Sequence, residues 1–432
     1  MVAKLILDKK REGHALGTAE IREFIEGFTR GEIPDYQMSA LAMAICCRGM
    51  TDRETADLTE AMKNSGRCLD WSVPTADKHS TGGVGDKLSL VVQPLAAACG
   101  VCVPSLTGRG LGLTGGTADK METIPGYSCA QTLARFQEIA TSVGVSLSVQ
   151  TDEITPADKK LYALRDVTGT VASIPLIVAS ILSKKLAEGA HTLVFDVKCG
   201  AGAFMRTRED ATALARALVA GAKAAGRRAA VLVTDMDVPL GFAVGNANEV
   251  AEALAMLKGE SDARLRPVVD LCIELAALMV SLELETELDA ARQMCRDRLA
   301  DGSAFARFAA MVEAHGGDLA RFAARVEKPT FKFRIQSMKS GCVTAIGAER
   351  VARAAFMLGA GHRKSGDKID PRAGVTLSVA VGEKVAVGAP LATLEKSFEP
   401  EGLEEAAAEL YKGFTVASAA PVEKPLILER ID

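Results

Sequence analysis

The segment Lys78-His79-Ser80-Thr81-Gly82-Gly83-Val84-Gly85-Asp86 places a lysine and two hydroxyls directly before a glycine-rich turn. The later segment Thr107–Asp119 has a similar glycine-rich composition. Glycine lets backbone N–H groups approach an anion without interference from a Cβ atom. Side-chain donors for the same anion are Lys78, Ser80, Thr81 and Thr117. One such loop is more often a tight turn, but two loops with these donors predict a phosphate site.

The chain around these loops alternates short β-branched runs with alanine-rich helical patterns. Strands are expected over 101–104, 193–197 and 229–234, and helices over 209–225 and 247–257. This alternation predicts an α/β fold with a central mixed sheet and ligand loops at the strand ends. We assign residues 68–155 and 189–328 to this phosphate-binding domain.

The N-terminal region, residues 1–67, is predicted to be a small all-helical domain. Ile21, Phe24, Ile25 and Phe28 follow helical spacing. Thr51-Asp52-Arg53-Glu54 has the form of a capping box for a helix that runs to about Asn64. Residues 156–188 read as a helix divided by Pro175, and we expect them to pack into this domain.

Residues 329–432 are predicted to form a β-rich C-terminal α+β lobe. Gly374–Leu394 alternates like hairpins around glycine turns. The pattern is superficially similar to biotinyl or lipoyl carrier domains. A carrier role is disfavoured, because Lys384 lies in Glu-Lys-Val rather than in a carrier tripeptide.

Composition excludes several classes of protein. The 432 residues are 48% hydrophobic with a net charge of −4, and they include one tryptophan and four tyrosines, which argues against a nucleic-acid surface. No stretch reaches the roughly 18 apolar residues of a membrane span, and residues 1–10 lack a signal-peptide core. Ten irregularly spaced cysteines fit reduced thiols. We therefore expect a cytoplasmic protein without membrane or nucleic-acid partners.

Two generic nucleotide motifs are disfavoured. Gly110–Gly115 matches G-x-G-x-x-G, but no acidic residue ends a second strand about twenty residues further on. The first glycine segment is not a Walker A loop, because Asp86 precedes Lys87 where that motif has glycine. These departures argue against a nicotinamide oxidoreductase and against ATP as the ligand.

Other polar side chains suggest a second half of the site. His79 lies inside a glycine segment and could assist proton or charge transfer, whereas the remaining histidines read as structural. Ser180 and Lys184 share one helix face and follow the apolar run Ile174–Ala179. We interpret this face as a polar ligand edge.

The ordered motifs resemble the thymidine and pyrimidine-nucleoside phosphorylases over nearly the whole chain. They comprise 78–86, 108–112 and 114–122, then Arg165, Ser180 and Lys184, then 196–198 and 202–205. The resemblance implies reversible phosphorolysis of a pyrimidine (deoxy)nucleoside to free base and (deoxy)ribose 1-phosphate. It also implies a cleft that closes by hinge motion and a homodimer joined through the helical domains. Inorganic phosphate would be the co-substrate, and no cofactor would be required.

The resemblance also implies residue roles. The phosphate ligands would be Lys78, Ser80, Ser89, Thr107 and Thr117. The pyrimidine and nucleoside ligands would be Arg165, Ser180 and Lys184, with His79 near O2 and with Tyr162 and Phe204 close by; His79, Arg165 and Lys184 would be catalytic. Two positions depart from the family pattern: Thr107 replaces a serine and Leu113 replaces a histidine.

Some bacterial relatives bind a monovalent or calcium ion beside the phosphate loop. The matching ligands for K⁺ or Ca²⁺ here would be the carbonyls of Gly85, Lys87, Leu240 and Ala243 with the carboxylate of Glu252. Glu252 could equally be a residue of a helix surface.

Several alternatives stay open. Pro239–Asn246 looks like the broad bacterial subgroup, which favours an enzyme that accepts thymidine and uridine over a thymidine-restricted one. An anthranilate-type phosphoribosyltransferase would share the architecture but require an acidic magnesium cluster. A non-catalytic nucleoside-binding protein would differ by showing no turnover.

Overall fold

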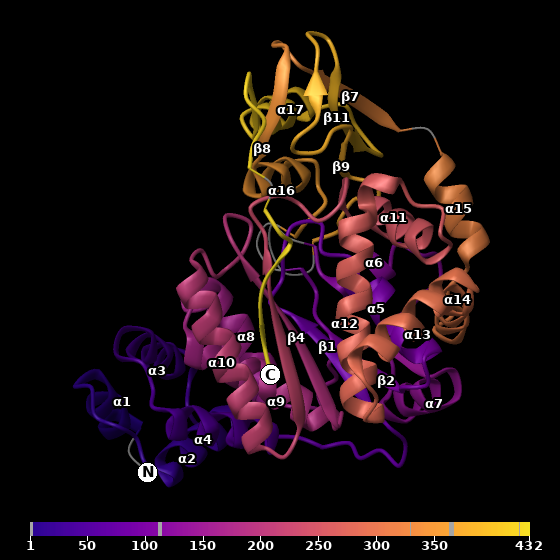
Figure 1. The fold of residues 1–432 in the computed structure, drawn as a ribbon. Helices are drawn as coiled ribbons and strands as arrows, with labels where there is room; N and C mark the ends of the chain where they lie inside the picture. Colours follow the sequence, from indigo (N-terminus) through magenta and orange to yellow (C-terminus); the bar gives the residue numbers. More distant parts are fainter. Residues whose placement is uncertain (1–2, 111–114, 329, 363–366, 423) are drawn as a thin grey trace.

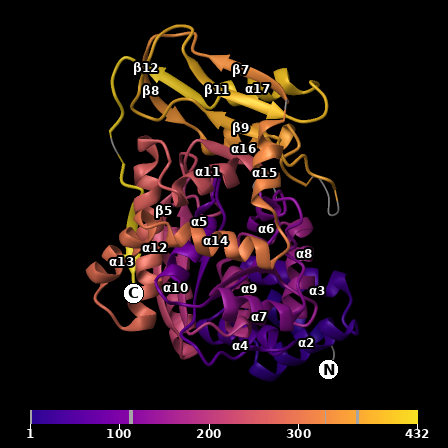
Figure 2. The same ribbon diagram turned by 90° about the vertical axis from the view of Figure 1, so that its right-hand side faces the viewer.

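The computed structural model describes residues 3–110, 115–328, 330–362, 367–422 and 424–432. Its helical end and its β-rich C-terminal lobe lie at opposite ends of the molecule, with the α/β domain between them (Figure 1 and Figure 2). This arrangement confirms the predicted fold class. No helix within the described ranges is both long and apolar enough to cross a membrane.

Six helices share the core of the helical end. They are α1 (Ala3–Arg11), α2 (Thr18–Arg30), α3 (Asp35–Arg48), α4 (Asp52–Lys63), α8 (Pro156–Thr168) and α9 (Ile174–Glu188). Phe24 and Leu58 from the first helices are buried in one cluster with Leu161 of α8 and Leu176 of α9. Pro175 lies in the first turn of α9, where its missing N–H breaks no helical hydrogen bond.

The central sheet of the α/β domain is mixed. Its order is β1-β4-β5-β13, in which β1 (Ala76–Ser80), β4 (Thr192–Cys199) and β5 (Arg228–Asp235) are parallel and β13 (Ile427–Ile431) is antiparallel. A second parallel pair, β2 (Val103–Thr107) and β3 (Val145–Val149), joins this region through the Thr75–Cys102 bridge. Parallel strands present their following loops at the same edge of a sheet, which is where α/β proteins bind ligands.

Helices cover both sides of the central sheet (Figure 1). α10 (Arg208–Ala224) packs against β4 and β5, and α12 (Arg266–Leu284) packs against β1, β4 and β5. The other helices of this region are α5 (Leu88–Ala98), α6 (Thr117–Met121), α7 (Leu133–Val143), α11 (Ala247–Leu257), the 3₁₀ helix η1 (Ala263–Leu265), α13 (Leu288–Ala300), α14 (Ser303–Ala314) and α15 (Leu319–Glu327).

Two antiparallel sheets build the C-terminal lobe. Their orders are β6-β9-β11-β7 and β10-β8-β12, with helices α16 (Ala348–Met357) and α17 (Leu403–Tyr411). The strands are β6 (Ala243–Gly245), β7 (Phe331–Gln336), β8 (Gly341–Ile346), β9 (Gly374–Leu377), β10 (Lys384–Val385), β11 (Pro390–Lys396) and β12 (Phe414–Ala417). The predicted run of hairpins is therefore divided between two sheets, because β9 pairs with β11 whereas β10 pairs with β8.

Candidate active site

The end of β1 and the start of α5 bring three predicted phosphate ligands together. Lys78 is buried in the sheet, and its Nζ lies 3.4 Å from Oγ of Ser89 and 3.6 Å from Oδ2 of Asp196. Ser80 donates to Oδ2 of Asp86 at 2.6 Å. The sequence places Lys78–Ser80 in a loop, but these residues pair with β4 as the last part of a strand. Their side chains are therefore held by the sheet.

Carboxylates keep Lys78 charged despite its burial. Burial lowers the pKa of Lys78, but Asp86 and Asp196 outweigh that effect and raise it. Burial conversely raises the pKa of Asp86, and Lys78 and Lys198 hold it well below its usual range. The arrangement therefore keeps a permanent cation beside the Ser89 hydroxyl.

Thr107 and Thr117, the other predicted phosphate ligands, flank the second glycine segment. Thr107 ends β2 and Thr117 begins α6. Arg109 is held by Glu122 at 2.7 Å and by Asp119 at 3.2 Å, so its charge serves the fold of this segment. The departure at Leu113 lies outside the described residues.

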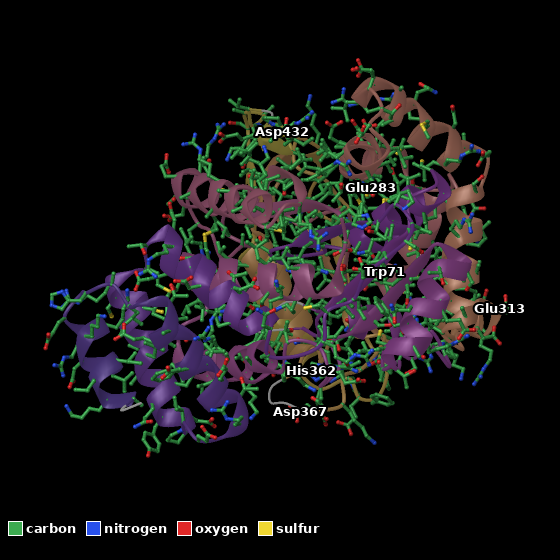
Figure 3. All side chains as sticks on the ribbon, turned by 90° about the horizontal axis from the view of Figure 1, so that it is seen from below. Trp71, Glu283, Glu313, His362, Asp367 and Asp432 are labelled. Atoms are coloured by element: carbon green, nitrogen blue, oxygen red, sulfur yellow. The ribbon has the colours of Figure 1, made fainter. Side chains whose placement is uncertain are left out.

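The C-terminal lobe contacts this second segment through one histidine. Nε2 of His362 lies 3.3 Å from Oδ1 of Asp119, and its Nδ1 lies 2.9 Å from the carbonyl of Asp367. Figure 3 labels His362 and Asp367, which lie close together. Asp119 also accepts hydrogen bonds from the N–H groups of Gly110 and Gly116. The contact ties the lobe to the glycine segment, although sequence reasoning assigned His362 only a structural role.

The predicted pyrimidine ligands lie on α8 and α9. Lys184 Nζ is 2.5 Å from Oδ2 of Asp158 and 3.0 Å from Oγ of Ser180. The same ammonium lies 5.5 Å from the ring centroid of the half-exposed Tyr162. Burial lowers the pKa of Lys184, and Asp158 opposes that effect. The structure thus brings Ser180, Lys184 and Tyr162 into one group.

Arg165, in contrast, is turned toward its own backbone. Its guanidinium is buried and donates to the carbonyls of Thr170, Val171 and Leu176 at 3.3, 2.7 and 3.0 Å. These bonds close the turn between α8 and α9. Because a guanidinium carries five N–H donors, two remain for a ligand.

Lysines of both groups act electrostatically on His79. Burial lowers its pKa well below the usual value, and the charges of Lys185, Lys184 and Lys78 lower it further. The imidazole is therefore neutral near pH 7 and offers one N–H donor. Phe204 is also close to the phosphate loop, since a Cβ on Gly82 would lie 3.9 Å from its ring.

Three of the five predicted cation ligands converge, but they converge on a lysine, whereas the carbonyls of Gly85 and Lys87 accept hydrogen bonds from the N–H groups of Lys87 and Leu90. Nζ of Lys87 lies 2.7 Å from the Leu240 carbonyl, 2.9 Å from the Ala243 carbonyl and 2.5 Å from Oε2 of Glu252. The side chain is fully buried. The prediction considered only the backbone carbonyl of Lys87. In the structure the side-chain ammonium of Lys87 occupies the position that an ion would need. These residues therefore do not fit a K⁺ or Ca²⁺ ion.

Sequence reasoning missed the carboxylates that hold the cations. Asp158 anchors Lys184, Asp196 pairs with Lys198 at 2.6 Å, and the pair Asp77 and Glu188 binds the buried Lys185 at 2.5 and 2.9 Å. Two of these carboxylates have a local signal: Glu188 lies three residues after Lys185 in one helix, and Asp196 lies two residues before Lys198 on the same face of β4. Asp158 and Asp77 are far in sequence from the lysines that they bind, so these two pairs are visible only in the tertiary structure.

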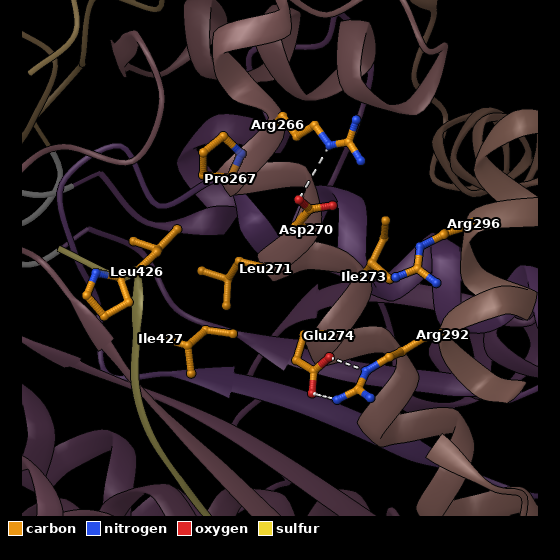
Figure 4. A pocket seen from close by; sticks show the side chains of 11 residues that line it. Arg266, Pro267, Asp270, Leu271, Ile273, Glu274, Arg292, Arg296, Leu426 and Ile427 are labelled. Carbon is orange, nitrogen blue, oxygen red and sulfur yellow. Dashed lines mark hydrogen bonds and ion pairs between the residues drawn. The ribbon is translucent and has the colours of Figure 1, made fainter. Parts of the chain in front are cut away.

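A pocket elsewhere in the molecule contains none of the predicted site residues. Its volume is about 440 Å³, and it lies between α12, α13 and the segment before β13 (Figure 4). Arg292 pairs with Glu274 at 2.7 Å and Arg266 with Asp270 at 3.7 Å. Because these two arginines are already paired with carboxylates, the pocket is not favoured as the candidate active site.

Comparisons with known families cover most of the chain. The helical bundle domain of a glycosyl transferase family matches residues 4–66, and the a/b domain of a glycosyl transferase family matches residues 72–305. The pyrimidine nucleoside phosphorylase C-terminal domain matches residues 342–417. These three matches correspond to the helical end, the α/β domain and the C-terminal lobe.

Full-length relatives agree with these matches. The chain is 44% identical to a pyrimidine-nucleoside phosphorylase of Geobacillus stearothermophilus over 98% of both chains. It is 45% identical to one of Bacillus subtilis over 97% of both chains. A thymidine phosphorylase of Mesorhizobium japonicum is 43% identical over 100% of this chain and 99% of its own.

The fold also extends to a more distant enzyme. A crystal structure of anthranilate phosphoribosyltransferase (TrpD) from Thermus thermophilus has a TM-score of 0.59 and 22% identity, covering 73% of this chain and 99% of that one. At this identity the likeness shows a shared architecture alone.

Proposed function

Because the chain belongs to the pyrimidine-nucleoside phosphorylases, we propose that it catalyses the reversible phosphorolysis of both thymidine and uridine. Inorganic phosphate is the co-substrate, and the products are the free base and the (deoxy)ribose 1-phosphate. The observation that carries this proposal is the presence of two groups that each combine a lysine with a hydroxyl: Nζ of Lys78 lies 3.4 Å from Oγ of Ser89, and Nζ of Lys184 lies 3.0 Å from Oγ of Ser180. The breadth of substrate is supported by the similarity of Pro239–Asn246 to the broad bacterial subgroup.

The phosphate half of the proposed site consists of Lys78, Ser80, Ser89, Thr107 and Thr117. Lys78 supplies the charge, and Ser89 supplies a hydroxyl 3.4 Å away in the first turn of α5. A helix N-terminus adds a partial positive charge for an anion. A phosphate bound at this position would face the sugar. It would act as the nucleophile, and its negative charge would stabilise the positive charge that develops on the sugar.

The pyrimidine half consists of Arg165, Ser180 and Lys184, with Tyr162 and Phe204 against the nucleoside. Cleavage of the C–N bond leaves negative charge on the departing base and positive charge on the sugar. Donors that face the pyrimidine oxygens therefore bind more strongly in the transition state than in the ground state. Neutral His79 donates one N–H to O2 without the desolvation cost of an imidazolium.

The proposal includes a homodimer joined through the helical domains, acting in the cytoplasm. The helical end exposes Leu5, Tyr36 and Met43, which are apolar side chains that a partner could cover. Free thiols at all ten cysteines fit a reducing compartment. Hinge closure of the two halves would exclude water and favour phosphorolysis over hydrolysis.

Release of free base from thymidine, deoxyuridine, uridine and cytidine, with and without phosphate, tests the proposal. We expect release from thymidine and uridine only with phosphate, and synthesis of nucleoside from base and ribose 1-phosphate. Release from thymidine alone would establish the thymidine-restricted alternative. Arg165→Ala should lower kcat/KM at least about tenfold, whereas Lys159→Ala, an exposed position on the same helix, should not.

A further inference from the structure

Lys87 occupies the place of an ion beside the proposed phosphate loop. We propose that its ammonium is a built-in replacement for the metal cation, so that this chain holds the loop in position without K⁺ or Ca²⁺. The inference rests on the proposed role of the loop in binding phosphate. It differs from the ion site that the sequence resemblance implies.

The geometry leaves no room for both cations. An ammonium has three N–H donors, and Lys87 Nζ meets three acceptors at 2.5–2.9 Å. A calcium ion would need the same oxygens at about 2.3–2.6 Å. Since the Lys87 side chain is fully buried, it has no solvent-facing position available without repacking. The ammonium therefore satisfies the oxygen cage and excludes an ion from it.

The cage of oxygens is held by hydrogen bonds of its own. Oε1 of Glu252 accepts from the N–H groups of Phe242 and Ala243 at 3.0 and 3.2 Å, so the carboxylate closes the turn that supplies the two carbonyls. Gly241 adopts a φ of +76° in this turn, and a Cβ there would meet Glu252 and Lys87. The cage is thus preorganised around the ammonium.

The cage connects the proposed phosphate loop to the rest of the molecule. Leu240 N–H donates to the Val84 carbonyl at 3.0 Å, and Ala243 begins β6, which pairs with β9 of the C-terminal lobe. A second buried lysine, Lys120, donates to the Asp86 carbonyl at 2.7 Å and pairs with Glu249. Loss of the Lys87 charge should therefore loosen the loop and weaken phosphate binding.

Exchange of ions on the unmodified enzyme is the first test. The protein is treated with a chelator and transferred to tetramethylammonium, an ion too large for the cage. We expect kcat, the KM for phosphate and the Tm to stay unchanged when K⁺ or Ca²⁺ is added back. A requirement for either ion, in turnover or in Tm, would overturn the proposal.

Lys87→Thr provides the second test, because it removes the ammonium and opens the cage. In tetramethylammonium its KM for phosphate should rise at least about tenfold and its Tm should fall; K⁺ should reverse both changes by mass action. Lys87→Met is the matched control, since its side chain fills the space without charge, and K⁺ should not rescue it. Equal behaviour of Lys87→Thr in both ions would contradict the inference.

The thermal measurements need no substrate. They therefore separate this inference from the proposed function. If the unmodified protein shows no phosphorolysis but K⁺ raises the Tm of Lys87→Thr, the proposed activity is refuted, whereas the proposal that the Lys87 ammonium replaces a metal ion still holds. If Lys87→Thr fails to fold, the ion exchange on the unmodified enzyme still decides the matter.

Discussion

Nζ of Lys184 lies 2.5 Å from Oδ2 of Asp158, across the packing of α8 against α9. Asp158 is buried, and its other oxygen has no hydrogen-bond partner among the described residues. The carboxylate keeps the partly buried ammonium charged and holds it beside Ser180. Asp158 is therefore a positioning residue for a cation that we propose meets the pyrimidine.

Asp158→Asn should reduce kcat/KM for nucleoside at least about tenfold, because Lys184 loses its charged partner. Burial would then lower the pKa of Lys184 without opposition, so the alkaline limb of the pH profile should move to lower pH. The KM for phosphate should stay constant. A uniform loss with an unshifted pH profile would instead indicate general damage to the fold.

Lys78→Met should raise the KM for phosphate and lower kcat/KM at least about tenfold, since it removes the buried cation next to Ser89. Steady-state kinetics with varied phosphate measures the effect. Lys412→Ala removes an exposed lysine of the C-terminal lobe and serves as the control. Near-normal phosphate kinetics in Lys78→Met would refute the phosphate assignment.

The pH dependence of His79 follows from its neutral state. Because burial and nearby lysines hold its pKa well below 6.5, kcat/KM should not fall as the pH decreases through 6.5. His79→Gln keeps a neutral donor and should retain more activity than His79→Ala. A drop centred on pH 6.5 that vanishes in His79→Gln would show that the imidazole titrates normally.

Stability at acid pH depends on the buried pair Lys10 and Glu54 in the helical domain. Their side chains lie 2.8 Å apart, and Glu54 also accepts from the N–H groups of Leu16 and Thr51. Burial raises the pKa of Glu54, but these partners lower it from 4.5 to about 2. As the pH falls, Glu54 therefore becomes protonated at a higher pH in the unfolded chain than in the folded protein. The stabilisation from this pair is lost as the pH falls from 4.5 to about 2.

Glu54→Gln should lower the free energy of unfolding at pH 7 by about 3 kcal/mol, because it leaves Lys10 buried without a charged partner. Denaturant titration at several pH values measures this difference, which should shrink below pH 4.5. The control variant Asp8→Asn removes an exposed ion pair with Lys4 and should change the free energy of unfolding by less than about 1 kcal/mol. Equal losses in both variants would contradict the role of burial.

The sequence by itself determined the elements whose signals are local. The predicted helix over 247–257 is observed as α11, and the Thr51 and Glu54 capping box begins α4. Helical periodicity and capping depend on residues within one or two turns, so they are readable from the chain. The fold class followed from the alternation of strands and helices in the same way.

Only the tertiary structure decided what each buried charge meets. The family resemblance implied that Lys87 contributes a carbonyl to an ion site, but its ammonium fills that site by binding Leu240 and Glu252, which lie 153 and 165 residues away in the sequence. Asp158 and Lys184 likewise meet only because α8 packs on α9. A buried charge is stabilised by whatever partner the fold brings within hydrogen-bond distance, and that distance is not encoded in local spacing.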